Sequence, residues 1–266
     1  MLISSAMKNV LTYVFLVLTC LAAPARADCV VMLHGLARTG NSFLVLERVL
    51  QTRGYEVVVA DYPSTEAPIE QLVKVIPEAI GQCHAPAVHF VTHSMGGILL
   101  RYWTEHNTAL GISRVVMLAP PNQGSEIVDE LGDLAPFEWI NGPAGLQLRT
   151  GDEGITSTLG PVQFELGVIA GSDTMNPAFS AILPGVDDGK VTVASTIVEG
   201  MKAHLTLPVT HTFIMQDPMA MAQVDLFLRE GRFDPDLDWT QEVDMHFFGC
   251  LAGICPAKKD ETPDEP

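Results

Sequence analysis

The chain of 266 residues is long enough for one α/β domain with a well-buried core, and its composition does not require a second domain. Thirty-two acidic residues against 15 basic ones give a formal net charge of −17 at pH 7. An acidic surface repels phosphate backbones, and the sequence has no basic stripe. We therefore expect no nucleic-acid partner.

The N-terminal segment, residues 1–27, is typical of an export signal. Lys8 supplies a positive start, the apolar run 10–23 carries no charge, and Ala25-Arg26-Ala27 offers small residues for cleavage. The apolar run is shorter than the roughly 20 residues that a membrane-spanning helix needs. We expect an exported protein, periplasmic or extracellular, whose mature chain begins near Asp28.

Cysteine usage agrees with export. Removal of the signal segment removes Cys20 and leaves four cysteines. Acylation of Cys20, as in a lipoprotein, is a less favoured alternative. We favour the pairs Cys29 with Cys83 and Cys250 with Cys255, because the first two lie near apolar strands and the last two lie close in sequence. Four cysteines allow three pairings, which the sequence leaves open. A metal site is less favoured, since the spacings lack a paired short Cys motif.

Short apolar runs alternate with longer segments of helical period. The runs predict β-strands over residues 30–33, 56–60, 88–92, 115–119 and 164–170. The helical spacing predicts helices over 43–50, 69–80 and 94–106, and a last helix that starts near His211 and includes Phe227 and Leu228. Gly54 would end the first helix, and Pro77 would kink the second helix or end its first part. The alternation predicts an α/β fold with a mostly parallel sheet between two helical layers.

Residues 120–162 interrupt this alternation. The segment is rich in Gly, Pro and acidic residues and has no clear period. A stretch of this length is commonly a functional loop or an inserted cap, and we favour a cap over a binding cleft against a plain surface excursion. We expect the domain to occupy residues 28–255. The tail 256–266 is charged, contains proline and lacks large apolar residues, so we expect it to be disordered.

A candidate nucleophile follows the third predicted strand. The run 88–92 leads into His93-Ser94-Met95-Gly96-Gly97, which is an apolar strand, a sharp turn and the start of a helix. Such a turn projects the serine hydroxyl away from the backbone, and the helix behind it aims its amides at the reacting centre. His93 and Gly96 would support the turn. A helix N-cap is the alternative role of Ser94, but the preceding strand and the partners described below favour a nucleophile.

This segment resembles the nucleophile elbow of the α/β-hydrolase superfamily, in particular the bacterial triacylglycerol lipase and esterase branch. The likeness extends from Val30 to about Phe233. It implies the α/β-hydrolase fold and acyl transfer through a Ser-His-Asp triad, without a metal or organic cofactor. One departure is Thr92, which stands where the first glycine of the family's G-x-S-x-G pattern belongs. The threonine must find room beneath the turn, but it removes no catalytic atom.

The resemblance also implies an oxyanion hole. His34-Gly35-Leu36 follows the first predicted strand, as the segment that supplies half of the hole does in these enzymes. The backbone amides of Leu36 and Met95 would bind the oxyanion. Gly35 would permit the unusual backbone path, and His34 would brace the loop rather than titrate. An ordinary strand-to-helix turn is the alternative, but the position one strand before the elbow favours the functional interpretation.

A nucleophilic serine needs a histidine base, and in this fold the chain order is Ser, then Asp or Glu, then His. Three of the eight histidines leave room for an acid after Ser94, namely His204, His211 and His246. His211 follows the apolar run 205–209 and precedes a helix, so it would lie in a loop at a strand end. His204 precedes that run and His246 lies in a tail region. We therefore expect His211 to be the base.

The acid is assigned by resemblance. Asp188-Gly189-Lys190-Val191 is similar to the Asp-Gly-x-Val segment that carries the triad aspartate in these lipases. Its neighbour Asp187 and the residue Asp173, which also follows a strand, are the alternatives. We favour Asp188 as the residue that orients His211.

These assignments predict a secreted serine hydrolase that cleaves carboxylic esters, either an esterase or a lipase. Its substrate would be a small-molecule ester or a lipid. The apolar residues of 120–162 would either form a lid that makes transient contact with a lipid surface or form the core of a small domain. An acyltransferase or amidase with the same triad is one alternative. A secreted binding protein that keeps the fold without turnover is another. The natural substrate, the acyl-chain length and the oligomeric state are left open by the sequence.

Overall fold

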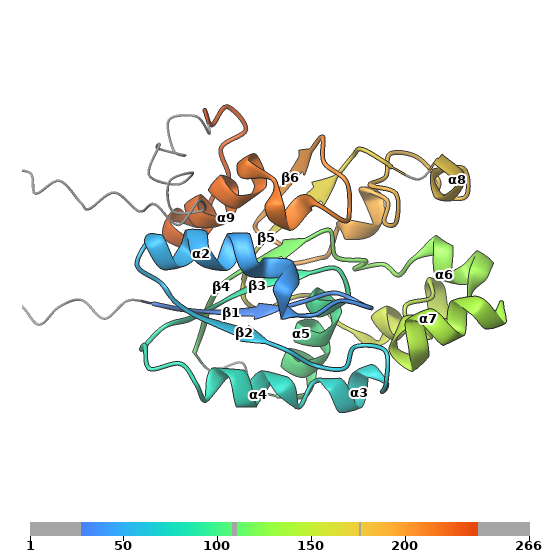
Figure 1. The fold of residues 1–266 in the computed structure, drawn as a ribbon, viewed down its shortest axis with the longest axis horizontal. Helices are drawn as coiled ribbons and strands as arrows, with labels where there is room; N and C mark the ends of the chain where they lie inside the picture. Colours follow the sequence, from blue (N-terminus) through green and yellow to red (C-terminus); the bar gives the residue numbers. More distant parts are fainter. Residues whose placement is uncertain (1–27, 108–110, 176, 239–266) are drawn as a thin grey trace, which may run out of the picture.

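Six parallel strands form one sheet in the order β2-β1-β3-β4-β5-β6. The computed structural model describes residues 28–107, 111–175 and 177–238 (Figure 1). The strands are β1 (Cys29–Leu33), β2 (Glu56–Ala60), β3 (Val88–His93), β4 (Ile112–Leu118), β5 (Glu165–Gly171) and β6 (Ala203–Leu207). The signal segment, Cys250 with Cys255, His246 and the tail lie outside the described residues.

Helices cover both faces of this sheet (Figure 1). They are α2 (Leu44–Thr52), α3 (Ile69–Leu72), α4 (Val75–Ile80), α5 (Met95–His106), α6 (Glu126–Leu131), α7 (Ala135–Leu146), α8 (Pro177–Ser180) and α9 (Pro218–Glu230). Figure 1 shows α2 and α9 on one side of the sheet and α3 and α4 on the other. The predicted α/β fold with helices on both faces is confirmed.

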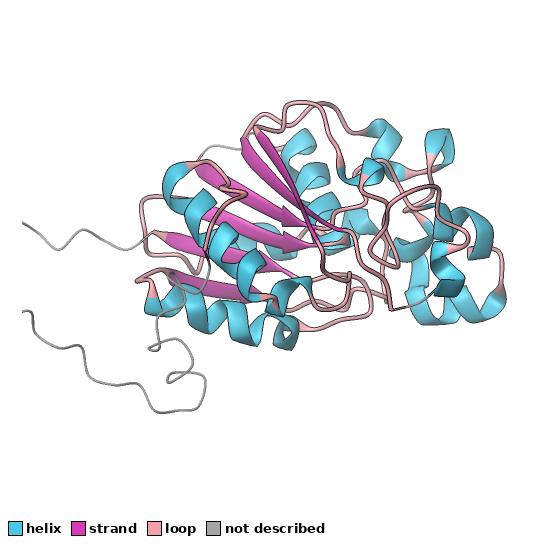
Figure 2. Cartoon of the chain, turned by 90° about the horizontal axis from the view of Figure 1, so that it is seen from above, coloured by secondary structure: helices cyan, strands magenta, loops and turns pink. Residues whose placement is uncertain are grey.

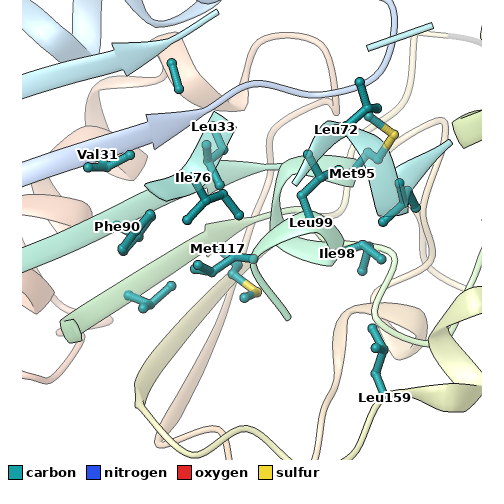
Figure 3. Close-up of a cluster of buried hydrophobic side chains, with 14 of the residues drawn as sticks. Val31, Leu33, Leu72, Ile76, Phe90, Met95, Ile98, Leu99, Met117 and Leu159 are labelled. Carbon is teal, nitrogen blue, oxygen red and sulfur yellow. The ribbon is translucent and has the colours of Figure 1, made fainter. Parts of the chain in front are cut away.

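The two faces are built from alternate residues of the same strands. Val30 and Met32 of β1 belong to the cluster under α2 and α9, whereas Val31 and Leu33 belong to the cluster under α3, α4 and α5. Figure 3 shows the second cluster, in which Leu33 lies near side chains of α4 and α5. Every residue of β1 is buried, which explains its continuous apolar sequence.

The predicted helix over 69–80 is divided into α3 and α4 at Val73 and Lys74. Pro77 lies in the first turn of α4 and has no N–H to donate to the carbonyl group of Val73, four residues earlier. The break therefore falls one turn before the proline, where its missing hydrogen bond and its ring act. The kink expected from Pro77 is confirmed.

The predicted start of the last helix is wrong. Helix α9 begins at Pro218, and His211 lies seven positions earlier, in a loop that also contains a 3₁₀ turn, Ile214–Gln216. The carboxylate of Asp217 accepts a hydrogen bond from the amide of Ala220 at 2.9 Å and caps the helix. Pro218 stands at the first helical position, where its fixed φ suits a helix start.

Residues 120–162 contain α6, α7 and two 3₁₀ helices, Gly151–Glu153 and Ile155–Thr158. Figure 1 shows α6 and α7 together at one end of the molecule, and Figure 2 shows the strands pointing toward that end. Helix α7 is bent at Gly142, whose φ of 63° is open to glycine. A Cβ atom at this position would lie 1.7 Å from the carbonyl oxygen of Thr65, so the bend brings α7 against the loop after β2.

A disulfide joins Cys29 at the start of β1 to Cys83 after α4, as predicted, with a Cα–Cα distance of 5.8 Å. It ties the α3–α4 side of the molecule to β1, the second strand from the edge of the sheet. In the described ranges, no helix has the length and apolar character needed to cross a membrane.

Loss of this disulfide should lower the free energy of unfolding. The bridge joins residues 54 positions apart, for which the chain-entropy model gives about 4 kcal/mol. Urea unfolding of the oxidised protein and of the Cys29→Ala/Cys83→Ala variant measures the difference. A Cys29→Val/Cys83→Ala variant, which refills the buried position of Cys29, separates the cross-link from packing. Equal stability of all three proteins would contradict the prediction.

Candidate active site

Ser94 occupies a strained turn between β3 and α5. Its φ of 52° and ψ of −126° lie in a region that residues with a side chain rarely adopt. The amide of Ser94 donates to the carbonyl oxygen of Leu118 at the end of β4, at 2.9 Å. Gly96 lies so close to β1 that a Cβ atom would be 2.3 Å from the carbonyl oxygen of Leu33. Both neighbouring strands therefore hold the turn in place.

Thr92 finds its room beneath the turn. The side chain is fully buried, and a Cβ atom at Gly97 would lie 3.2 Å from its hydroxyl oxygen. The glycine in α5 thus provides the space that a first glycine would leave in the strand. Among the described residues the Thr92 hydroxyl has no hydrogen-bond partner, which is unfavourable for a buried polar group.

The structure brings Ser94, His211 and Asp188 together. Nε2 of His211 lies 3.1 Å from the Ser94 hydroxyl, and Nδ1 lies 2.8 Å from Oδ2 of Asp188. Donation by Nδ1–H to the carboxylate leaves the Nε2 lone pair facing the serine hydroxyl. All three side chains are largely buried, with Ser94 the most exposed at 9%. This arrangement can remove the hydroxyl proton as the oxygen attacks a substrate.

The carboxylate of Asp188 is fixed by the backbone around it. Oδ1 accepts hydrogen bonds from the amides of Lys190 at 3.0 Å and Val191 at 2.8 Å. The amide of His211 donates to the carbonyl oxygen of Asp188 at 3.0 Å, so the two loops are also joined through their backbones. Gly171 at the end of β5 admits this loop, because a Cβ atom there would lie 2.7 Å from Cβ of Asp188.

The alternative acids point elsewhere. Oδ1 of Asp187 accepts from the Ser180 hydroxyl and from the amide of Gly189, each at 2.7 Å. Asp173 is exposed, and its carboxylate accepts from the amide of Thr174. Neither carboxylate is bonded to His211.

The alternative histidine within the described residues also has another partner. His204 lies in β6, and its Nε2 is 2.8 Å from the hydroxyl of Thr196. His211 lies beyond the end of the same strand, four residues after Leu207. Of these two residues, only His211 contacts Ser94.

The loop of Leu36 packs directly on the elbow. A Cβ atom at Gly35 would lie 3.1 Å from Cβ of Ser94 and 2.8 Å from Nδ1 of His93, which leaves no room for a larger residue. Met95 is the first residue of α5, so its amide has no partner within the helix. Neither the amide of Met95 nor that of Leu36 donates to another residue in the described part of the chain. Two N–H groups without a partner in the described residues thus belong to the two segments that meet at Ser94, and oxyanion binding uses N–H groups of this kind.

His34 has the contacts of a bracing residue. It is fully buried and stacks on Tyr62 with ring centroids 4.0 Å apart. Its Nε2 accepts from the amide of Tyr62 at 3.3 Å, its Nδ1–H donates to the carbonyl oxygen of Gly35, and the Tyr62 hydroxyl donates to the carbonyl oxygen of His34. Burial lowers the pKa of His34, so it remains neutral. Tyr62, which lies just after β2, belongs to no recognisable sequence motif and was not predicted as a site residue.

His93 contacts the backbone of His211 and holds it in place. Its Nε2–H donates to the carbonyl oxygen of His211 at 3.0 Å, and the two rings lie 4.8 Å apart. Burial holds the pKa of His93 well below 6.5, and a positive charge on His211 would lower it further. A neutral His93 therefore positions the backbone of His211 and does not compete for its proton.

A pocket of about 290 Å³ opens above Ser94 and His211. Much of its wall comes from α6 and α7, which belong to the segment 120–162, and from α8, which lies outside that segment. The large apolar side chains that these segments contribute are Ile127, Val128, Phe137, Ile140, Leu148 and Phe179. The sequence predicted a cap in 120–162 but did not single out these pocket residues, because they are scattered over segments without a regular period. Two cations, Arg38 and Lys190, were also missed.

Residues 30–252 match the model of the alpha/beta hydrolase family. The match covers most of the chain, and the protein belongs to this family. No curated protein matches it in sequence. Within the described residues, no cluster of three or more His, Cys, Asp or Glu side chains could hold a metal ion.

Several solved structures share the fold. Mature lipase BlEst2 of Bacillus licheniformis is 18% identical over 79% of this chain and 94% of its own, with a TM-score of 0.59. Phospholipase PlaB of Legionella pneumophila, in complex with thio-NAD, is 16% identical over 86% of this chain and 62% of its own, with a TM-score of 0.62. Lipase B of Aspergillus fumigatus is 16% identical over 80% of this chain and 55% of its own, with a TM-score of 0.59. At these identities the likeness is one of fold.

Acid should destabilise the protein through its buried histidines. Burial lowers the pKa values of His34, His89 and His93 below the unfolded value of 6.5. Between the folded and unfolded pKa values of a histidine, the unfolded state binds more protons than the folded state. The contribution of these histidines to the free energy of unfolding is therefore fully present above about pH 6.5 and is lost as the pH decreases. Each histidine contributes up to about 1.4 kcal/mol per pH unit.

Urea unfolding at a series of pH values from about 7.5 to about 5 measures this slope. The His93→Gln variant keeps a side-chain N–H donor but cannot titrate, and it should show a smaller slope. The matched control is Lys74→Gln, an exposed site that leaves all eight histidines in place. A stability that does not change over this range would contradict the prediction.

Proposed function

We propose that the protein is an exported serine hydrolase that cleaves carboxylic esters through Ser94, His211 and Asp188. The observation that carries the proposal is the pair of contacts made by His211, with one ring nitrogen on the Ser94 hydroxyl and the other on the Asp188 carboxylate. The fold is also that of solved lipases, which supports an ester substrate. The disulfide between Cys29 and Cys83 supports export, because such bonds persist in oxidising compartments.

The reaction proceeds by acyl transfer in two steps. His211 takes the proton of Ser94 as the serine oxygen attacks the ester carbonyl carbon, and the amides of Leu36 and Met95 hold the oxyanion. The bond to the alcohol then breaks, and His211 gives its proton to the leaving oxygen. In the second step His211 activates water, which releases the acid and restores the serine. Asp188 stabilises the charged imidazole throughout.

Ester turnover by the purified mature protein tests this proposal. Esters of 4-nitrophenol with short and long acids should be hydrolysed, and Ser94→Ala should lower kcat by a factor of about 10⁴ or more. Asp188→Asn should lower kcat by about 10⁴-fold, because it disturbs the tautomer of His211. Asp187→Asn is the matched control at the neighbouring carboxylate. Equal rates for the wild type and Ser94→Ala would contradict the proposal.

We also propose that α7 touches lipid surfaces during turnover. Leu134, Trp139 and Ile140 are 54%, 81% and 65% exposed, and Ile140 also lines the pocket. Large exposed apolar side chains next to a pocket mark a surface that binds apolar material. Trp rings are suited to the boundary between water and lipid.

Emulsified and soluble esters separate this contact from the chemistry. Trp139→Ser should lower the ratio of the rate on emulsified triacylglycerol to the rate on soluble 4-nitrophenyl acetate by about fivefold or more, since roughly 1 kcal/mol or more of apolar burial is lost. The control is Leu44→Ser on α2, which removes a side chain that is 65% exposed outside the pocket. If this ratio of rates is the same in Trp139→Ser and in Leu44→Ser, the proposed contact of α7 with lipid is contradicted.

A further inference from the structure

Two cationic side chains, Arg38 and Lys190, line the pocket that contains Ser94 and His211. The described pocket wall includes no aspartate or glutamate. This local positive charge stands out in a chain with 32 acidic and 15 basic residues.

Both cations stand on turns that belong to the proposed catalytic machinery. Arg38 follows Ala37, whose φ of 53° turns the chain directly after Leu36. Lys190 follows Gly189, whose φ is 91°, and its amide is bonded to the carboxylate of Asp188. The backbone that sets the oxyanion amide and the acid therefore also sets the two cations.

Within the described residues neither cation is in direct contact with an acidic side chain, although the charge of Asp188 acts on Lys190 from a distance. In the described ranges, neither the guanidinium of Arg38 nor the ammonium of Lys190 forms an ion pair or a hydrogen bond. The carboxylate of Asp188 accepts hydrogen bonds from His211 and from two backbone amides instead. Elsewhere in the described part of the chain, six arginine and lysine residues do form ion pairs with acids, namely Arg53, Arg114, Arg149, Lys202, Arg229 and Arg232.

The two positive charges lie on the same pocket, where Arg38 is partly buried and Lys190 is exposed at its rim. Desolvation lowers the pKa of Arg38, and desolvation together with the charge of Arg38 lowers the pKa of Lys190, against the charge of Asp188, which raises it. Both charges also help to lower the pKa of His93 beneath the pocket. An arrangement of this kind is unfavourable for the empty protein, and an anion bound beside it would relieve the repulsion.

We infer that the pocket binds esters that carry an anionic group, a carboxylate or a phosphate, which Arg38 and Lys190 hold while Ser94 attacks the ester carbonyl. This inference rests on the proposed ester hydrolysis. The planar guanidinium of Arg38 can donate two hydrogen bonds to such a group, and the ammonium of Lys190 supplies a second charge. The apolar wall from α6 and α7 receives the hydrocarbon part of the same substrate.

Matched ester pairs test the inference and distinguish the two sources of the anion. The first pair is mono(4-nitrophenyl) suberate and 4-nitrophenyl octanoate, which differ by a carboxylate at the end of the acyl chain. The second pair is 1-octanoylglycerol 3-phosphate and 1-octanoylglycerol, which differ by a phosphate on the alcohol. Ser94→Ala supplies the background rate for each ester. In at least one pair, kcat/KM should be about tenfold higher for the anionic ester at low salt, and added salt should reduce the preference.

Substitution of the cations should remove this preference. Arg38→Gln and Lys190→Gln should each lower the ratio of anionic to neutral kcat/KM by about fivefold to tenfold, mainly through a higher KM. Lys74→Gln changes the net charge by the same amount outside the pocket and is the matched control. A wild-type ratio of one or less in both pairs, or a ratio that neither pocket variant changes, overturns the inference.

Binding without turnover keeps this test separate from the proposed function. Ser94→Ala protein, with both cations intact, is titrated with octyl phosphate, suberate and octanol in a calorimeter. Tighter binding of either anion than of octanol, lost in the triple variant with Arg38→Gln and Lys190→Gln, supports the anion site even if no ester is cleaved. Equal binding of all three probes overturns the site even if neutral esters are cleaved.

Discussion

The close approach of the start of α5 to β1 is the constraint on which the rest of the site depends. Gly96 lies against the carbonyl oxygen of Leu33, where no larger residue fits, and Ser94 must then take a positive φ to connect β3 with the helix. The same approach leaves the amide of Met95 open beside the loop of Leu36. Serine and amide groups are thus placed by backbone packing within the central strands, which is more rigid than placement by side chains.

His211 and Asp188 reach this turn from loops beyond the carboxyl ends of β6 and β5, the edge where parallel α/β sheets commonly bind ligands. Buried neutral histidines hold the surroundings in place, since His93 supports the backbone of His211 and His34 supports that of Gly35. The pocket above them combines an apolar wall with two cations that form no ion pair within the described residues, in an acidic protein. The proposed substrate has the complementary form, with an apolar chain, an ester and an anionic group.

Residue type and period were sufficient to predict the sheet and its helical layers, because buried parallel strands are continuous apolar runs. Residue type and period were insufficient to predict helix ends and pocket residues, which depend on local contacts in the folded chain. Helix α9 starts at Pro218 because Asp217 caps it, although the apolar pattern suggested an earlier start. Helix α7 has exposed apolar residues that obscure its period, and Arg38 looks like any surface arginine until the fold brings it to the pocket. Chain order and resemblance selected Ser94, His211 and Asp188, and the fold brings these three together.

Covalent labelling of Ser94 tests the central claim most directly. The mature protein is treated with a fluorophosphonate, digested, and analysed by mass spectrometry beside the His211→Gln variant. The account predicts one adduct on the peptide that contains Ser94, formed quickly in the wild type and at least about a hundredfold more slowly without His211, since the histidine activates the hydroxyl. No adduct on the wild type, an adduct on another serine, or equal labelling of both proteins would contradict it.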